Sequence, residues 1–326
     1  MRMLLKISQY GIFPLLFVLW SSLAAYAAET DQYLAWGVQL KDSSEAFNRY
    51  LNNQAEEFLR KKNHHAQRDY TPEKLTQELY FRLFHGLYSA RVRTWTNRSN
   101  EIDRFPDKSV SRFRYQQMSI YRDLSFPYVL PMARTIRLGD VYLGVDKISH
   151  FFGFGRRYFK RYLRHRERGI PEDEAIEEVI RWGIVFERHF VGGLVDGIVS
   201  HADLEAAFQG FRMAKDLSGG ENPAIVHDGN RWVLARPIDI RPYITPDFDE
   251  SYNNSVCWGA RRRHVLTRLK AQYAAKRSLP EVQERFARYR QAAPSLSKKV
   301  ITKYLDEKKM RPQQEQSVDA LCAARE

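Results

Sequence analysis

Cysteine is nearly absent from this chain, and its scarcity excludes several classes of protein. Only Cys257 and Cys322 occur among 326 residues. A small disulfide-rich fold needs several cysteine pairs, and a structural zinc site built from thiolates needs more sulfur ligands than this chain has. In an oxidising compartment the two thiols could still form one disulfide, and the sequence leaves that alternative open.

Long hydrophobic runs and familiar catalytic motifs are also missing beyond the N-terminus. The most apolar later stretch, residues 182–200, is interrupted by charged side chains, which are costly in hydrocarbon. There is no H-E-x-x-H zinc motif, no G-x-S-x-G nucleophile elbow and no glycine-rich phosphate loop. We therefore expect a soluble chain after its N-terminal segment, with any chemistry carried by a less familiar group of residues.

The N-terminus has the three parts of a secretory signal. A basic start precedes a largely apolar run at residues 11–25, and small residues in an A-x-A pattern end at Ala27. Residues 1–27 are therefore predicted to be a cleaved signal peptide, which places the mature protein in the periplasm or outside the cell. The alternative is an uncleaved membrane anchor, because residues 7–28 are nearly long enough to span a bilayer.

Positive charge is in excess, with a net charge of +13 at pH 7. Such a balance indicates attraction to an anionic envelope component or membrane surface, and export makes nucleic acid the least expected partner. One group of basic residues on a predicted helix could form the binding surface, namely Arg156, Arg157, Lys160 and Arg161. The alternative for this group is an ordinary solvated helix face.

Helical patterns dominate the chain after the signal. Capping residues and apolar positions three or four apart predict helices over residues 44–63, 72–87, 146–168, 171–190, 200–216, 260–276, 278–293 and 297–309. A Ser278/Glu281 capping box is expected to begin the helix over 278–293. Two short β-hairpins are predicted at 135–144 and 224–235.

Residues 91–133 show no clear period and are predicted to be irregular. The fold class is thus mainly α. We expect one helical domain over residues 28–260 with two small β-hairpins, followed by a basic helical extension over 261–326.

The candidate site comes from three successive predicted helices. Asp146 and His150 are four residues apart and share one helix face, and aromatic residues continue that face, which indicates that it points inward. Glu187 falls on the apolar stripe of the next helix. A buried carboxylate must be paired, hydrogen-bonded, metal-bound or protonated, so we expect these groups to meet near Ser200 and Asp203 at the start of the third helix.

Two interpretations of this grouping stay open. Asp146, His150 and Glu187 could be catalytic residues that hold a divalent metal or activate a water, since imidazole and carboxylate groups suit both roles. They could instead form a buried hydrogen-bond network that fixes how the helices dock. The network is favoured because no specific metal-ligand spacing is present. Ser200 and Asp203 are likewise explained by a capping box, and residues 249–254 by a turn rather than a cation site.

The same residues resemble a known pattern. Asp146-Lys147-x-x-His150, then Glu187, then Ser200-x-x-Asp203-Leu204-x-Ala206-x-x-x-Gly210 is similar to the D-K-x-x-H…E…S-x-x-D-L-x-A-N-x-x-G order of envelope proteins of the YfiM-like and VanZ-like kind. The resemblance covers residues 144–212 and departs at Ala207, where the pattern has Asn. It implies a shared polar core of Asp146, Lys147, His150, Glu187 and Asp203. Lys147, Ser200 and Asp203 are the candidate binding residues of this segment. The resemblance brings no established reaction.

We therefore expect an exported, non-catalytic envelope protein with a buried Asp/His/Glu core and a basic surface for an anionic partner. The alternative is a hydrolase-like enzyme that uses a metal or a water on an envelope lipid or polymer. Solvent access distinguishes the two, because an enzyme needs an open cleft that reaches His150 and Glu187.

Overall fold

The computed structural model describes residues 29–64, 69–85, 90–122, 132–189, 197–257 and 259–308. Helices dominate this part of the chain, and its strands form antiparallel pairs only, which confirms the predicted mainly α class with small β-hairpins. None of the helices in these ranges is both long and apolar enough to cross a membrane. The predicted signal peptide and Cys322 lie outside the described residues, so the signal and the disulfide stay predictions.

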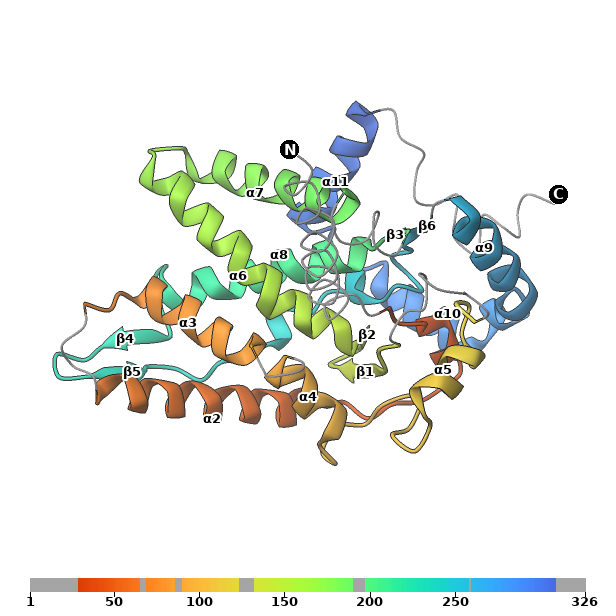
Figure 1. Ribbon diagram of the computed structural model, residues 1–326, viewed down its shortest axis with the longest axis horizontal. Helices are drawn as coiled ribbons and strands as arrows, with labels where there is room; N and C mark the ends of the chain where they lie inside the picture. Colours follow the sequence, from red (N-terminus) through yellow and green to blue (C-terminus); the bar gives the residue numbers. More distant parts are fainter. Residues whose placement is uncertain are drawn as a thin grey trace, which may run out of the picture.

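Two closely packed helices form the centre of the molecule, α6 (Val145–Glu167) and α8 (His201–Ser218). Helices α3 (Pro72–Phe84) and α7 (Glu172–Phe186) pack against α6 (Figure 1). The close approach of α6 and α8 depends on glycine: a Cβ atom on Gly155 would lie 2.8 Å from the carbonyl carbon of Gly210. Larger side chains at this crossing would force the two helices apart.

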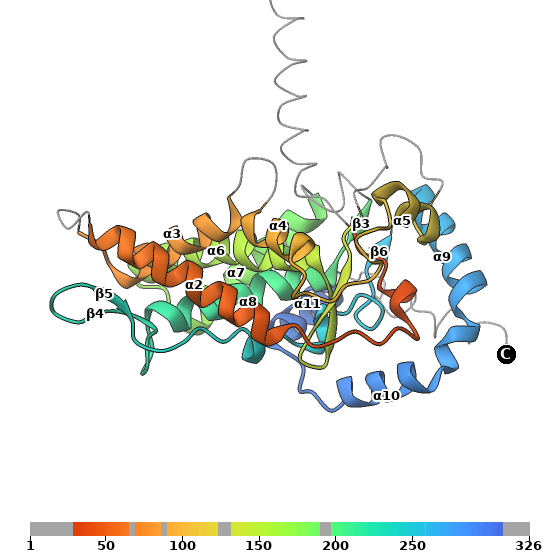
Figure 2. The same ribbon diagram turned by 90° about the horizontal axis from the view of Figure 1, so that it is seen from below.

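The predicted hairpins are both present. Strands β1 (Thr135–Leu138) and β2 (Val141–Gly144) pair around a turn whose Gly139 has φ of 58°, and β2 leads directly into α6. Strands β4 (Ile225–His227) and β5 (Trp232–Leu234) form the second hairpin. It lies beside the long helix α2 (Ser44–Asn63) (Figure 2).

The prediction of irregular structure over residues 91–133 is wrong for two segments. Helices α4 (Arg91–Arg98) and α5 (Arg112–Met118) form there. Each is too short to show a repeating apolar pattern, since α4 buries only Val92 and Thr96 among its residues. A Ser111 hydroxyl that accepts a hydrogen bond from the Arg114 N–H begins α5.

The C-terminal helices are α9 (Gly259–Tyr273), α10 (Pro280–Tyr289) and α11 (Leu296–Glu307). Helix α11 packs on α7 and α8, and Val300 and Ile301 belong to the main hydrophobic core. The predicted Ser278/Glu281 capping box is wrong, because Ala275–Ser278 forms a 3-10 turn, η5, and Leu279 precedes α10 without a side-chain cap. The predicted domain boundary at residue 260 stays a prediction.

Short elements complete the fold around the start of α6 and α8. They are the 3-10 turns η1 (Gln32–Ala35), η3 (Arg241–Tyr243) and η4 (Pro246–Phe248), and the paired strands β3 (Ile198–Val199) and β6 (Val256–Cys257). The pairing of β3 with β6 holds the loop that follows η4 next to the first turn of α8. This loop carries Glu250 to the centre of the molecule.

Candidate functional site

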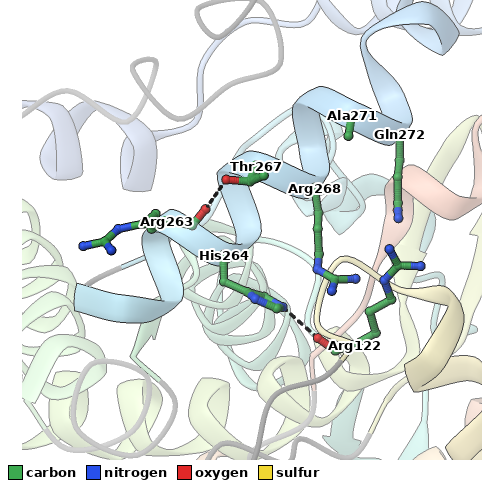
Figure 3. Close-up of a pocket in the computed structure, with 7 residues that line it drawn as sticks. All are labelled: Arg122, Arg263, His264, Thr267, Arg268, Ala271 and Gln272. Carbon is green, nitrogen blue, oxygen red and sulfur yellow. Dashed lines mark hydrogen bonds between the residues drawn. The ribbon is translucent and has the colours of Figure 1, made fainter.

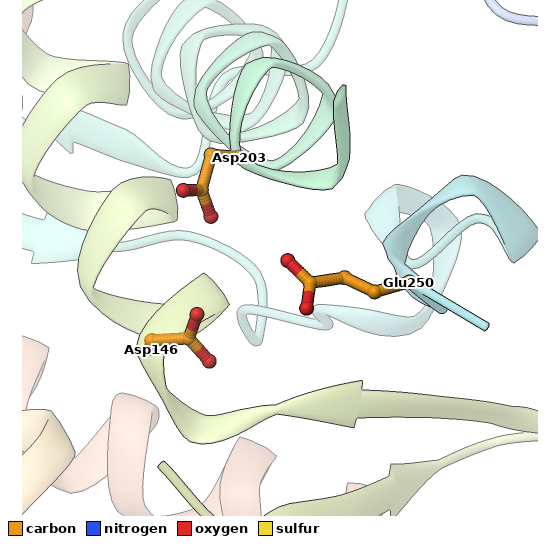
Figure 4. Close-up of side chains that lie close together, drawn as sticks. All are labelled: Asp146, Asp203 and Glu250. Carbon is orange, nitrogen blue, oxygen red and sulfur yellow. The ribbon is translucent and has the colours of Figure 1, made fainter. Parts of the chain in front are cut away.

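Three carboxylates point toward one another where the first turns of α6 and α8 meet the loop after η4 (Figure 4). Asp146 comes from α6, Asp203 from α8 and Glu250 from the loop. All three are buried, with exposed fractions of 5% or less. Buried carboxylates need a nearby cation, hydrogen-bond donors or protons, and the neighbouring residues supply a cation and hydrogen-bond donors.

The ammonium of Lys147 lies at the centre of this cluster. Its Nζ atom is 2.7 Å from Asp146 Oδ2, 2.6 Å from Asp203 Oδ1 and 2.6 Å from Glu250 Oε1, and its side chain is fully buried. A lysine has three N–H donors and no acceptor. The three carboxylates and the Ser200 hydroxyl, 3.4 Å from Nζ, supply acceptors for all of them. Burial alone would lower the pKa of Lys147, but these carboxylates hold that pKa well above its ordinary value.

The cluster has three carboxylates and one ammonium, so negative charge is in excess. The pKa values of two of the acids are raised and that of the third is lowered. Burial raises the pKa of Asp203 to about 6 and that of Glu250 to about 7, although Lys147 lowers both. Asp146 behaves differently, because Lys147 and a 2.6 Å hydrogen bond from the Thr30 hydroxyl outweigh its burial and lower its pKa. Asp146 is therefore the permanent anion, while Glu250 takes up a proton near neutral pH.

Ser200 links the cluster to the predicted cap of α8. Its Oγ accepts a 3.2 Å hydrogen bond from the Asp203 N–H, which confirms the serine half of the capping box. The same hydroxyl donates a 2.8 Å hydrogen bond to Glu250 Oε1. In a capping box Asp203 would accept a hydrogen bond from the Ser200 N–H. Here Glu187 Oε1 accepts that bond instead, at 3.4 Å, and Asp203 binds Lys147.

His150 lies at the edge of the cluster. Its Nε2 is 3.4 Å from Asp203 Oδ2, and its ring stacks on Phe154 with centroids 5.1 Å apart. Burial, followed by the charge of Lys147, lowers the pKa of His150 to about 3. The imidazole is therefore neutral at physiological pH and does not add a second positive charge to the cluster.

The residues predicted to act together are thus divided in the structure. Asp146 and His150 lie in or beside the cluster, whereas Glu187 is buried as predicted but is used by the backbone at Ser200. Among the described residues, oxygen atoms of Asp146, Asp203 and Glu250 come within 4.8 Å of one another and could hold a metal ion. This set shares only Asp146 with the predicted metal ligands. The Lys147 ammonium already occupies its centre, so a cation would have to displace it.

Glu250 is the residue that the sequence does not reveal. The predicted turn over residues 249–254 is present, with the Asn253 N–H donating to the Asp249 carbonyl, but Glu250 also enters the cluster. The second oxygen of Glu250, Oε2, has no protein partner in the described ranges. Glu250 lines a cavity of about 20 Å³ with Thr30 and Ser255, which is room for about one water.

The four basic residues predicted to bind an anionic partner lie further along α6, beyond His150. Three of their guanidinium groups cover aromatic rings: Arg156 lies 5.0 Å from the Phe81 ring centre, Arg157 4.9 Å from that of Phe154, and Arg161 5.4 Å from that of Trp182. Arg157 and Lys160 are exposed to solvent. These four residues, Arg156, Arg157, Lys160 and Arg161, define the basic α6 face. Its Arg157 borders the cluster, because the Phe154 ring beneath its guanidinium stacks on His150.

The YfiM-like and VanZ-like resemblance over residues 144–212 stays a prediction. A function for the chain is therefore argued from the positions and contacts of its own residues. Comparison of the chain with protein-family models, with curated proteins and with solved structures gives no match.

Proposed function

We propose that the protein is an exported, non-catalytic envelope protein that binds an anionic membrane surface through its basic α6 face. The observation that carries this proposal is a group of positive side chains on α6 without ion-pair partners. Within the part of the chain that the structure describes, Arg157, Lys160 and Arg161 form no ion pair. Neighbouring cations differ, because Arg181 pairs with Glu177 and Glu307, and Lys215 pairs with Glu172.

The aromatic rings beneath these cations support a lipid surface as the partner. Arg156 covers Phe81, whose side chain is 44% exposed. The Arg157 guanidinium lies 4.9 Å from the centre of the Phe154 ring and 5.7 Å from that of Phe186, two rings that contact each other. An exposed ring such as that of Phe81 suits the boundary between lipid headgroups and acyl chains, while guanidinium groups bind the phosphates above it. Attraction to an anionic leaflet contributes about 1 kcal/mol for each Lys or Arg near the surface.

The buried cluster supports the non-catalytic part of the proposal. An enzyme needs its reacting groups at an open cleft, but Lys147 is fully buried and His150 is 4% exposed. The cavity beside Glu250 has a volume of about 20 Å³, too small for an envelope lipid or polymer. The cluster is best explained as a clamp that joins α6, α8 and the loop after η4. The alternative is a hydrolase that uses a metal or a water, and it requires this clamp to open. Elemental analysis of the purified protein shows whether a metal is bound.

The proposal is tested by sedimentation of the mature protein with vesicles. We expect binding to vesicles of phosphatidylcholine with phosphatidylglycerol, and none to phosphatidylcholine alone. The triple variant R157E/K160E/R161E should bind at least about 100-fold more weakly, since three attractive contacts of about 1 kcal/mol each are lost. Added salt should weaken wild-type binding because these charges are exposed.

A matched control has the same change of net charge at another place. R288E/R290E/K299E reverses three exposed cations on α10, at its end and on α11, and this variant should bind nearly as wild type does. Equal loss in both triple variants would show that only net charge matters, and full retention by the α6 variant would refute the proposed surface. Export is tested separately by fractionating the source cells and sequencing the N-terminus of the mature protein.

A further inference from the structure

Helix α5 presents an aromatic ring to solvent between two cations. Arg112, Phe113 and Arg114 are consecutive in the sequence and all three are exposed. The Phe113 side chain is 72% exposed, against 44% for Phe81 on α3. Single exposed apolar side chains are common on protein surfaces, but this ring has an arginine on each side. These three residues are called the α5 contact.

The exposure of Phe113 is set by the packing of α5. Tyr115 is 1% exposed and lies in an apolar cluster that α5 shares with α9, and its hydroxyl donates a 3.0 Å hydrogen bond to the Ala133 carbonyl. After α5, the Arg122 backbone oxygen accepts a 2.7 Å hydrogen bond from His264 Nε2 of α9 (Figure 3). Residues two apart on a helix point in nearly opposite directions. The burial of Tyr115 therefore holds the Phe113 ring outward.

The two arginines of the α5 contact lack carboxylate partners. Within the ranges that the structure describes, neither Arg112 nor Arg114 forms an ion pair. The last acid before α5 in the sequence is Asp107, and its carboxylate accepts a 2.9 Å hydrogen bond from the Ser109 N–H. Both guanidinium groups are therefore available to an anionic partner.

Positive charge continues from α5 to the basic α6 face. Burial, followed among the cations by Arg112, lowers the pKa of Arg93 on α4. Burial and the buried lysine lower the pKa of His150 most, and Arg93 and Arg157 lower it further. Since the interaction between charges falls off with distance, Arg93 lies near both the α5 contact and the basic α6 face.

The two basic regions lie on the same side of the molecule. Helices α3, α4 and α5 follow one side, the upper one in Figure 2, whereas α10 lies on the opposite side. Arg156 of the basic α6 face covers Phe81 of α3, which places that face on the side of α3. One flat anionic surface can therefore contact α5 and α6 together.

We infer that the α5 contact is a second point of attachment to the anionic membrane surface, at which the Phe113 ring enters the acyl boundary and Arg112 and Arg114 bind lipid phosphates. The inference rests on the proposed function and adds an apolar anchor outside α6. A bilayer accepts a single ring at its boundary, whereas a protein partner needs a larger contact area than one ring. Two attachments on one side fix the orientation of the bound protein.

Sedimentation with vesicles of phosphatidylcholine and phosphatidylglycerol tests the ring. Phe113→Ser should bind at least about tenfold more weakly than wild type, since it loses the burial of one Phe side chain. It should melt at the wild-type temperature because the ring is exposed. Leu296→Ser is the matched control, because Leu296 on α11 is 45% exposed and should not reach the bilayer. This control should bind as wild type does.

Insertion is measured directly by quenching. Vesicles of the same lipids with brominated acyl chains quench tryptophan that enters the apolar layer. Phe113→Trp should be quenched more than wild type, and Leu296→Trp no more than wild type. This readout separates insertion of the ring from attraction between charges, which added salt weakens.

The flanking cations are tested by R112E/R114E. This variant should bind at least about tenfold more weakly than wild type, because two attractive contacts with an anionic leaflet become repulsive. R288E/R290E makes the same change of net charge at exposed positions at the end of α10, on the opposite side of the molecule (Figure 2). It should bind nearly as wild type does, and equal losses in the two variants would refute a specific role for α5.

Two other results would overturn the inference: wild-type affinity of Phe113→Ser, or equal quenching of Phe113→Trp and Leu296→Trp. If R157E/K160E/R161E loses binding in that case, the basic α6 face stands without the α5 contact. Loss of binding in Phe113→Ser with full retention in R157E/K160E/R161E shows the reverse. Absence of wild-type binding to anionic vesicles refutes both contacts.

Discussion

The Nζ atom of Lys147 lies 2.6 Å from Oε1 of Glu250, and both side chains are buried. This ion pair joins the first turn of α6 to the loop after η4, two segments far apart in the sequence. Ser200 at the start of α8 donates to the same carboxylate. One buried lysine thus fixes the arrangement of three separate parts of the fold.

Removal of that lysine should be strongly destabilising. Lys147→Met keeps the unbranched apolar stem of the side chain but leaves Asp146, Asp203 and Glu250 without their cation, and breaking a buried ion pair in this way costs about 3–5 kcal/mol. Urea denaturation measures the loss in the free energy of unfolding. Lys215→Met is the control, because Lys215 pairs with Glu172 at a partly exposed site, where an ion pair is worth about 1 kcal/mol or less. Equal losses in the two variants would contradict the clamp.

The excess negative charge of the cluster should appear as a pH dependence of stability. The pKa of Glu250 is about 7 in the folded protein against an ordinary value of 4.5, so the folded state holds a proton that the unfolded state releases between these values. The stability contributed by this group is complete below about pH 4.5 and is lost as pH rises through 7.

Glu250→Gln removes this titration. The stability of the variant relative to wild type should therefore rise between about pH 5 and about pH 8. Asp203→Asn should change in the same direction, with its transition nearer to pH 6. Denaturant titrations at both pH values measure the difference. Parallel stability curves for wild type and both variants would show that the cluster does not titrate in this range.

Imidazole NMR spectra should show that His150 stays neutral. Burial and the Lys147 charge lower the pKa of His150 to about 3, whereas its ordinary value is 6.5. Between about pH 6.5 and pH 3 the imidazole is protonated in the unfolded state but not in the folded state. This group therefore lowers the free energy of unfolding as pH falls through that range. The His150 ring should take up no proton between pH 5 and 8, so its signals should show only the small shifts caused by the titration of Asp203 and Glu250. Full protonation of the ring near pH 6.5 would show an open site.

Much of the fold could be predicted because its signals are local. Thr71 and Pro72 begin α3, and the Thr71 hydroxyl accepts from the Lys74 N–H as expected for a cap. The inward face of α6 was predicted from the spacing of Asp146, His150 and the aromatic residues after them. Helices α4 and α5 could not be predicted, since seven or eight residues give too few apolar positions to show a period.

The candidate site was predictable only in part, because Glu250 joins it from a segment that is distant in the sequence. The pattern around Asp146 and Asp203 indicated a polar core, but nothing near Glu250 in the sequence shows that it reaches Lys147. One signal could have found it: a buried lysine needs several acceptors, and the acidic residues of the 249–254 turn were available to supply them. The exchange of roles between Glu187 and Asp203 likewise requires the structure.

Ser200→Ala should cost more than the loss of a helix cap alone. The substitution removes the cap of α8, which is worth about 1 kcal/mol, and also the 2.8 Å hydrogen bond to the buried Glu250, which adds about 1–3 kcal/mol. Ser111→Ala is the matched control, because Ser111 caps α5 at an exposed position. Thermal and urea unfolding of both variants give the comparison. If Ser200→Ala costs no more than Ser111→Ala, its bond to Glu250 contributes nothing.

Gly210→Ala tests the crossing of α6 and α8 that brings Asp203 to Lys147. A Cβ atom at Gly210 would lie 1.9 Å from the backbone oxygen of Phe151, so the backbones of the two helices must separate. Overpacking of this kind costs about 1–3 kcal/mol, more than the gain of about 1 kcal/mol that alanine brings to a helix.

Gly153→Ala on α6 is the control for this crossing, because its Cβ would meet the ring of the half-buried Phe84, and a side chain can rotate where a backbone cannot. We expect Gly210→Ala to lower the free energy of unfolding more than Gly153→Ala. The reverse order would mean that the two central helices are not held at the distance that the lysine cluster requires.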